Sequence, residues 1–83
     1  MFNNFLKMVN EKIEGEEMLT VAMECNGVHI MDSITPDVAY IDDGIYITGG
    51  WFSLNIDGDF EIDYDDYEDE YIVRCGDAAF YFS

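Results

Sequence analysis

An alternation of acidic and apolar residues in the second half of the chain constrains the fold more than any other feature of the sequence. Every odd position from Asp57 to Asp65 is acidic, and the last even positions between them carry Phe60, Ile62 and Tyr64. A period of two is typical of a strand with one buried face and one solvated face. The sequence therefore predicts a half-buried β-strand here, with a row of carboxylates along its outer face.

The acidic character continues past this alternation as far as Glu70. Between Asp57 and Glu70, nine of the fourteen residues are Asp or Glu, and none is Lys or Arg. Side chains on one face of a strand lie about 6.6–6.8 Å apart. One DNA strand carries a phosphate every ~3.4 Å along the helix axis, and helical winding stretches the gap between neighbouring phosphates toward the same value. A rigid row of carboxylates at this pitch predicts a surface that fits a nucleic-acid-binding groove.

The overall charge favours a partner of the same class. Nineteen Asp and Glu against three Lys and Arg give a net charge of −16 in 83 residues. Direct binding to nucleic acid or to an anionic membrane is excluded because like charges repel, whereas a basic protein would be steered toward this chain. The composition is 49% hydrophobic and 16% aromatic, which is too apolar for a disordered acidic tail. We therefore expect a folded acidic protein with a basic partner.

The length of the chain predicts a single domain that spans residues 1–83. No apolar stretch reaches the ~18 residues that a membrane helix needs, and the first twelve residues lack the pattern of a secretory signal. We therefore expect a cytoplasmic protein. Its two cysteines, Cys25 and Cys75, are expected to be free thiols, although their spacing alone is also compatible with a disulfide.

The N-terminal segment has the pattern of an amphipathic helix. Apolar residues recur there at intervals of three and four residues, namely Phe2, Phe5, Leu6, Val9 and Ile13. We expect Asn3 or Asn4 to cap the start of the helix and Gly15 to end it.

Tight turns divide the rest of the chain into antiparallel hairpins. The clearest turns are Asn26-Gly27, Asp42-Asp43-Gly44 and Gly76-Asp77. The first turn pairs Met23 with Ile30. The second, with Gly44 in a left-handed conformation, pairs Ala39 with Ile47 and keeps the apolar side chains on one face.

A further hairpin is expected to carry the acidic strand. A three-residue loop that ends at a left-handed Gly58 pairs Leu54 with Phe60 and separates an apolar face from an acidic one. In this register Trp51 lies opposite Asp63, among the carboxylates. The sequence thus predicts an α+β fold, with one N-terminal helix packed on a bent antiparallel sheet of about six to eight short strands.

Two other kinds of site have weaker support. The acidic residues match the ligand spacing of an EF-hand calcium loop, with Asp57, Asp59, Glu61, Asp63, Asp65 and Glu68 at its ligand positions. However, Ile62 occupies the position that requires glycine, and a strand cannot wrap its oxygens around one ion. The single histidine, His29, has no nucleophile at a catalytic spacing. We therefore expect no metal site, no cofactor and no enzymatic activity.

In size, charge and strand-borne acid, the chain resembles the small phage-encoded DNA-mimic inhibitors, which include anti-CRISPR proteins and uracil-DNA glycosylase inhibitors. Residues 57–70 and the net charge carry this resemblance. It implies that the protein occupies the basic groove of a bacterial defence nuclease in the infected host, with an RNA-guided CRISPR effector as the first choice. An immunity protein or antitoxin against a basic toxin nuclease is the alternative, as is an inhibitor of a DNA repair or restriction enzyme.

The expected contacts with the partner combine carboxylates with two exposed aromatic anchors. The expected partner-binding residues are Asp42, Asp43, Trp51, Asp57, Asp59, Glu61, Asp63, Asp65, Asp66, Tyr67, Glu68, Asp69 and Glu70. The sequence leaves open whether the protein acts as a monomer or as a homodimer.

Overall fold

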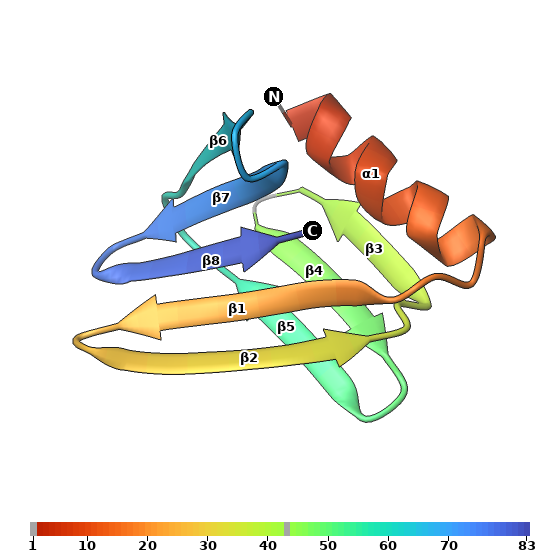
Figure 1. Ribbon diagram of the computed structural model, residues 1–83, viewed down its shortest axis with the longest axis horizontal. Helices are drawn as coiled ribbons and strands as arrows, with labels where there is room; N and C mark the ends of the chain where they lie inside the picture. The colour runs from red at the N-terminus through yellow and green to blue at the C-terminus, as the bar shows by residue number, and fades with distance from the viewer. Residues whose placement is uncertain (1, 43) are drawn as a thin grey trace.

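The computed structural model describes residues 2–42 and 44–83 (Figure 1). In this part of the chain, one helix precedes eight strands: α1 (Phe2–Glu14), β1 (Leu19–Cys25), β2 (Val28–Ile34), β3 (Val38–Ile41), β4 (Ile45–Gly49), β5 (Phe52–Ile56), β6 (Glu61–Asp65), β7 (Glu70–Cys75) and β8 (Ala78–Phe82). The strands form a five-stranded sheet in the order β2-β1-β8-β7-β6 and a three-stranded sheet in the order β3-β4-β5, and every pairing is antiparallel. The predicted α+β fold with its N-terminal helix is confirmed, but the strands are divided between two sheets rather than one bent sheet.

The core lies between the two sheets and is closed on one side by α1. Figure 1 shows β4 and β5 crossing behind β1 and β8, with α1 beside β3. Buried apolar side chains come from the helix and from both sheets: Phe5, Val9, Leu19, Val21, Ile34, Ile45, Ile47, Ile56, Val73 and Phe82. The Phe5 ring meets those of Phe82 and Tyr71 edge-on, at centroid distances of 5.0 and 5.6 Å. This burial determines which face of each strand points inward.

The helix covers nearly the residues that the sequence predicts. Asn3 and Asn4 do not cap it, because the helix begins upstream of them at Phe2 and both belong to its first turn. It ends immediately before Gly15, as predicted. Glu16 follows in a left-handed conformation (φ 53°) and donates its backbone N–H to a carbonyl of the last turn at 3.2 Å.

The hairpin registers that depend on local turns are confirmed. Met23 faces Ile30 across β1 and β2, and Ala39 faces Ile47 across β3 and β4. Glycine is needed at position 44 because a larger side chain would collide with the backbone carbonyl of β5. The conformation of that loop also involves Asp43, which lies outside the described residues.

The register predicted for the acidic strand is wrong. Leu54 of β5 pairs with β4 rather than with the acidic strand, and β6 pairs with β7, where Ile62 faces Val73. Gly58 is left-handed (φ 83°) as predicted, but its loop passes from one sheet to the other instead of closing a hairpin. The alternation specifies which face of β6 is buried. It does not specify the neighbouring strand, and β7 offers an arginine opposite the carboxylates where β5 offers none.

Candidate functional site

Strand β6 forms a free edge of the five-stranded sheet and has the two faces that the sequence predicts. Ile62 faces the fully buried Val73, so it points toward the core, whereas Glu61 faces the exposed Arg74 on the outer side. Asp63 and Asp65 share the outer face with Glu61 because side chains alternate along a strand. The predicted carboxylate row is therefore confirmed for Glu61, Asp63 and Asp65, with a repeat of about 6.6–6.8 Å. Asp57 and Asp59, which the sequence placed in the same row, precede the strand.

Arg74 makes the carboxylates of this row unequal. Its Nη1 donates a hydrogen bond to Oδ2 of Asp63 at 2.5 Å, and both side chains are about half exposed. An exposed pair of this kind contributes only about 0–1 kcal/mol to stability, but it neutralises part of the row. Sequence reasoning missed this residue because it lies outside the acidic segment. The signal that could have found it is that it is the single arginine of the chain.

The turn between β6 and β7 is held by its own side chains. Oδ1 of Asp65 accepts hydrogen bonds from the backbone N–H groups of Tyr67 (2.9 Å) and Glu68 (3.2 Å), as in an Asx turn. Asp69 is left-handed (φ 53°) and accepts a hydrogen bond from the Tyr64 hydroxyl. This hydrogen bond is the main reason that the pKa of Tyr64 is raised to about 12, with further contributions from burial and from nearby negative charge. Tyr67, which is 93% exposed, is thus presented by an ordered turn.

Some of the acidic side chains are free to meet a partner. Between Asp57 and Glu70, four exposed carboxylates make no side-chain hydrogen bond and no ion pair: Asp59, Glu61, Asp66 and Glu68. Three of them follow one another along β6 and its turn. We name the outer face of β6 together with the β6–β7 turn, residues 61–70, the acidic surface. It combines uncompensated charge with the highly exposed ring of Tyr67.

Glu70 is the carboxylate of the acidic surface whose charge is least favourable in the folded protein. It faces Asp65 directly across the β6–β7 pairing, and like charges in opposed positions destabilise a sheet. Its side chain is half-buried, and this burial raises the pKa of Glu70, as do the charges of Glu68 and Asp65. The folded protein therefore carries an electrostatic cost at this position.

Replacing Glu70 with glutamine should stabilise the protein at neutral pH. The folded-state pKa of Glu70 lies above its unfolded value. The ionised side chain therefore destabilises the folded protein fully at pH values above the folded pKa, and this destabilisation is lost as the pH falls through that pKa. We expect Glu70→Gln to gain about 0.2–1 kcal/mol at pH 7, and to reduce the stability that the wild type gains on acidification toward pH 5. Urea denaturation at both pH values checks this. Glu68→Gln, at an exposed neighbour, should change the pH dependence less. A Glu70→Gln protein with the wild-type pH dependence would contradict the assignment.

No protein-family model, curated protein or solved structure matches this chain. The resemblance to DNA mimics consequently remains one of size, charge and strand-borne acid. What the protein binds must be inferred from the chemistry of the acidic surface.

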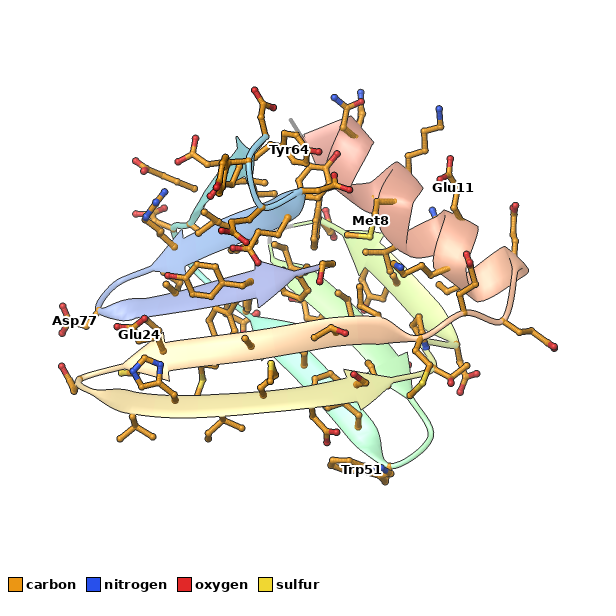
Figure 2. The ribbon with its side chains drawn as sticks, in the orientation of Figure 1. Met8, Glu11, Glu24, Trp51, Tyr64 and Asp77 are labelled. Atoms are coloured by element: carbon orange, nitrogen blue, oxygen red, sulfur yellow. The ribbon has the colours of Figure 1, made fainter. Side chains whose placement is uncertain are left out.

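The predicted position of Trp51 among the carboxylates is wrong. It sits in the β4–β5 turn and is 81% exposed. Tyr64 belongs to β6, the strand of the acidic surface. Figure 2 shows Trp51 at the opposite end of the molecule from Tyr64. The prediction failed because it depended on a pairing between β5 and β6, which belong to different sheets.

The other predicted carboxylates lie near the start of the acidic segment. Oδ1 of Asp57 accepts a hydrogen bond from the Tyr46 hydroxyl at 3.0 Å, and Gly44 of the β3–β4 turn lies against the same carboxylate. Asp42 is exposed in that turn, so the turn adjoins the acidic segment, as the sequence suggested. Asp43 lies outside the described residues.

The remaining chemistry-bearing residues are spread over the five-stranded sheet. His29 faces Glu24 across the β1–β2 hairpin, with Nδ1 3.9 Å from Oε2 at the surface.

Cys25 and Cys75 are free thiols on β1 and β7, and each pairs with Ala78 of the intervening strand β8. Two strand spacings, about 9.6 Å, separate them, which exceeds the ~7 Å limit for a disulfide. The described residues contain no group of three or more His, Cys, Asp or Glu that could hold a metal ion.

The helix is the remaining element to consider for membrane insertion. With 13 residues, α1 is too short to cross a bilayer, and the described part of the chain has no other helix that could do so.

Proposed function

We propose that this protein is a nucleic-acid mimic that inhibits a bacterial defence nuclease by binding in its basic DNA- or RNA-binding groove. The observation that carries the proposal is the acidic surface itself. Its free carboxylates, Glu61, Asp66 and Glu68, follow one another along a strand edge and a turn, on a chain with a net charge of −16. The like-charge contact between Asp65 and Glu70 costs stability, and a cationic partner would relieve that cost.

The order of the β6–β7 turn supports a binding role over a merely solvated surface. Two backbone hydrogen bonds to Asp65, and one from Tyr64 to Asp69, hold the turn in one conformation before any partner arrives. Groups that are already ordered lose less entropy on binding than a flexible acidic tail does. A compact inhibitor could therefore compete with a long nucleic acid for the same groove.

Tyr67 gives the proposed interface a natural centre. Exposed tyrosines are enriched among residues that dominate binding energy, and this ring stands between Asp66 and Glu68. Arginine suits such a site because its guanidinium can stack on an aromatic ring and donate two hydrogen bonds to a carboxylate. Grooves that bind phosphates are rich in this residue.

An RNA-guided CRISPR effector is the target class that we propose first. Such enzymes hold a nucleic-acid duplex in a positively charged channel and read a short DNA motif with arginines. The protein would then act as an anti-CRISPR protein in the cytoplasm of the infected bacterium. In this proposal it performs no catalysis and needs no cofactor.

A capture experiment tests the proposal. The tagged protein would be incubated with lysate of its bacterial host and washed at moderate salt, and the bound proteins would be identified by mass spectrometry. We expect one nucleic-acid-binding defence enzyme, and its loss when Glu61, Asp66 and Glu68 are changed to amides. Capture of a single toxin nuclease would favour an immunity protein instead. Indiscriminate capture of ribosomal and other polycationic proteins, or no capture, would contradict specific inhibition.

A further inference from the structure

Strand β2 is the second free edge of the five-stranded sheet, and it is unprotected from Val28 to Met31, before its one charged residue, Asp32. Val28 and Ile30 are each 55% exposed, and Met31 is 74% exposed. Natural edge strands are usually blocked by lysine, proline, a bulge or a covering element. The stretch from Val28 to Ile34 contains no Lys, Arg or Pro, and its pairing with β1 runs without a bulge. An open apolar edge of this length is a template for pairing with another strand.

The direction of the β2 backbone groups follows from a hydrogen-bonded pair at the start of β1. Thr20 exchanges both of its backbone hydrogen bonds with Ser83, at 2.9 and 3.0 Å, so its backbone groups point toward β8. These directions alternate along an antiparallel strand. Met23 therefore points its backbone groups toward β2, and its partner Ile30 points back toward β1. The residues on either side of Ile30 consequently direct their backbone groups to the open edge.

One of the outward N–H groups of β2 is already satisfied. The backbone N–H of Ser33 donates to Oδ1 of the adjacent Asp32 at 2.8 Å. Within the described part of the chain, no strand lies beyond β2 to bond the others. His29 and Met31 are therefore the two residues of β2 whose N–H and C=O groups are both available to another strand.

We propose that two copies of this protein form a homodimer by antiparallel pairing of their β2 strands about a two-fold axis at Ile30. In this register His29 of one protomer pairs with Met31 of the other, which closes four backbone hydrogen bonds. Ile30 faces its own counterpart on the core side, so two exposed apolar side chains bury one another. Ser33 keeps its bond to Asp32. The available groups are thus matched by an identical strand, as a two-fold interface requires.

The charge distribution favours a second copy as the occupant of this edge. Strand β2 contains one acidic residue, Asp32, whereas the acidic surface lies at the opposite edge, four strand spacings or about 19 Å away. In the dimer the two β6 edges would be nine spacings apart, about 43 Å, which is far beyond the screening length of about 8 Å at physiological salt. A basic partner would be drawn to the acidic surface rather than to β2. The charged β6 edges would also stop the addition of further copies.

A register-specific disulfide tests the proposal in a background that carries Cys25→Ala and Cys75→Ala. Position 30 would face itself in a non-hydrogen-bonded pair with Cα atoms about 4.5 Å apart, which is within disulfide range. The two copies of position 28 would be four residues out of register, about 13 Å apart. We expect Ile30→Cys to form a covalent dimer under mild oxidation at least about tenfold faster than Val28→Cys, which is equally exposed. Equal rates, or no covalent dimer of Ile30→Cys, would overturn the proposed register.

Light scattering on the unmodified protein gives the second test. We expect a dimer that becomes tighter between low salt and about 0.5 M salt, because two strongly acidic protomers repel one another. Met31→Lys should weaken it about tenfold or more, whereas Met18→Lys, an equally conservative change at a residue that is 56% exposed, should not. A monomer at all concentrations, or a dimer that Met31→Lys leaves intact, would overturn the proposal. This inference does not rest on the proposed function, since neutralising Glu61, Asp66 and Glu68 should leave the dimer unchanged.

Discussion

Replacing Phe5 with alanine should remove a large part of the stability of the protein. The ring is 1% exposed and packs edge-on against Phe82 and Tyr71, which attaches α1 to the five-stranded sheet. Loss of a buried phenylalanine ring costs about 3–5 kcal/mol. A domain of this length has a total unfolding free energy of only about 4–12 kcal/mol, and crowded carboxylates bring it toward the low end. Urea denaturation followed by circular dichroism would measure the change.

Leu6→Ala is the matched control, because Leu6 is the next residue of the same helix and is only half-buried. We expect it to lose about 1 kcal/mol or less. Phe5→Leu, which keeps most of the buried volume, should retain more stability than Phe5→Ala. If Phe5→Ala and Leu6→Ala were equally costly, Phe5 would not be the contact that joins the helix to the core.

Local patterns in the sequence were enough to predict much of the fold. The apolar spacing of residues 2–13 gave α1, and Asn26-Gly27 gave a two-residue turn with the observed pairing of Met23 and Ile30. The alternation around Ile62 correctly assigned the buried and solvated faces of β6. These features depend on residues close together in the chain, which is why they can be read without a structure.

The neighbour of β6 could not be predicted in the same way. Pairing of Phe60 with Leu54 and pairing of Ile62 with Val73 both bury apolar side chains, so burial alone does not discriminate between β5 and β7. One feature that favours β7 is Arg74, which faces Glu61 and bonds Asp63 across the strands. That contact joins residues eleven positions apart. The error in the strand pairing then carried over to Trp51.

The candidate site shows the same division between local and non-local information. Its acid density was evident from residues 57–70, as was the exposure of Tyr67. The separate tasks of the carboxylates were not evident. Asp65 organises the turn, Asp63 is bonded to an arginine, and Glu70 is half-buried. Each of these tasks depends on a contact made only in the folded chain, so the sequence could supply the charge of the surface but not its distribution.

The largest effect on binding is expected from the carboxylates that have no intramolecular partner. Changing Glu61, Asp66 and Glu68 together to Gln, Asn and Gln should weaken binding to the captured target about 10²–10³-fold. Close charge pairs at interfaces contribute from about 1.5 kcal/mol each, and 1.4 kcal/mol corresponds to a factor of ten. Calorimetric titration at one fixed salt concentration would give the two dissociation constants. These side chains are exposed and unpaired, so the melting temperature should not fall.

A variant with Glu11, Glu14 and Glu16 changed to glutamine separates local charge from total charge. All three are exposed on or just beyond α1 (Figure 2 labels Glu11), and both triple variants have the same net charge, −16 + 3 = −13. We expect the helix variant to weaken binding less than about threefold, mainly through slower association, because distant charges act by steering and are screened. Equal losses from the two variants would mean that total charge drives binding. The ordered carboxylates around Tyr67 would then have no special part in it.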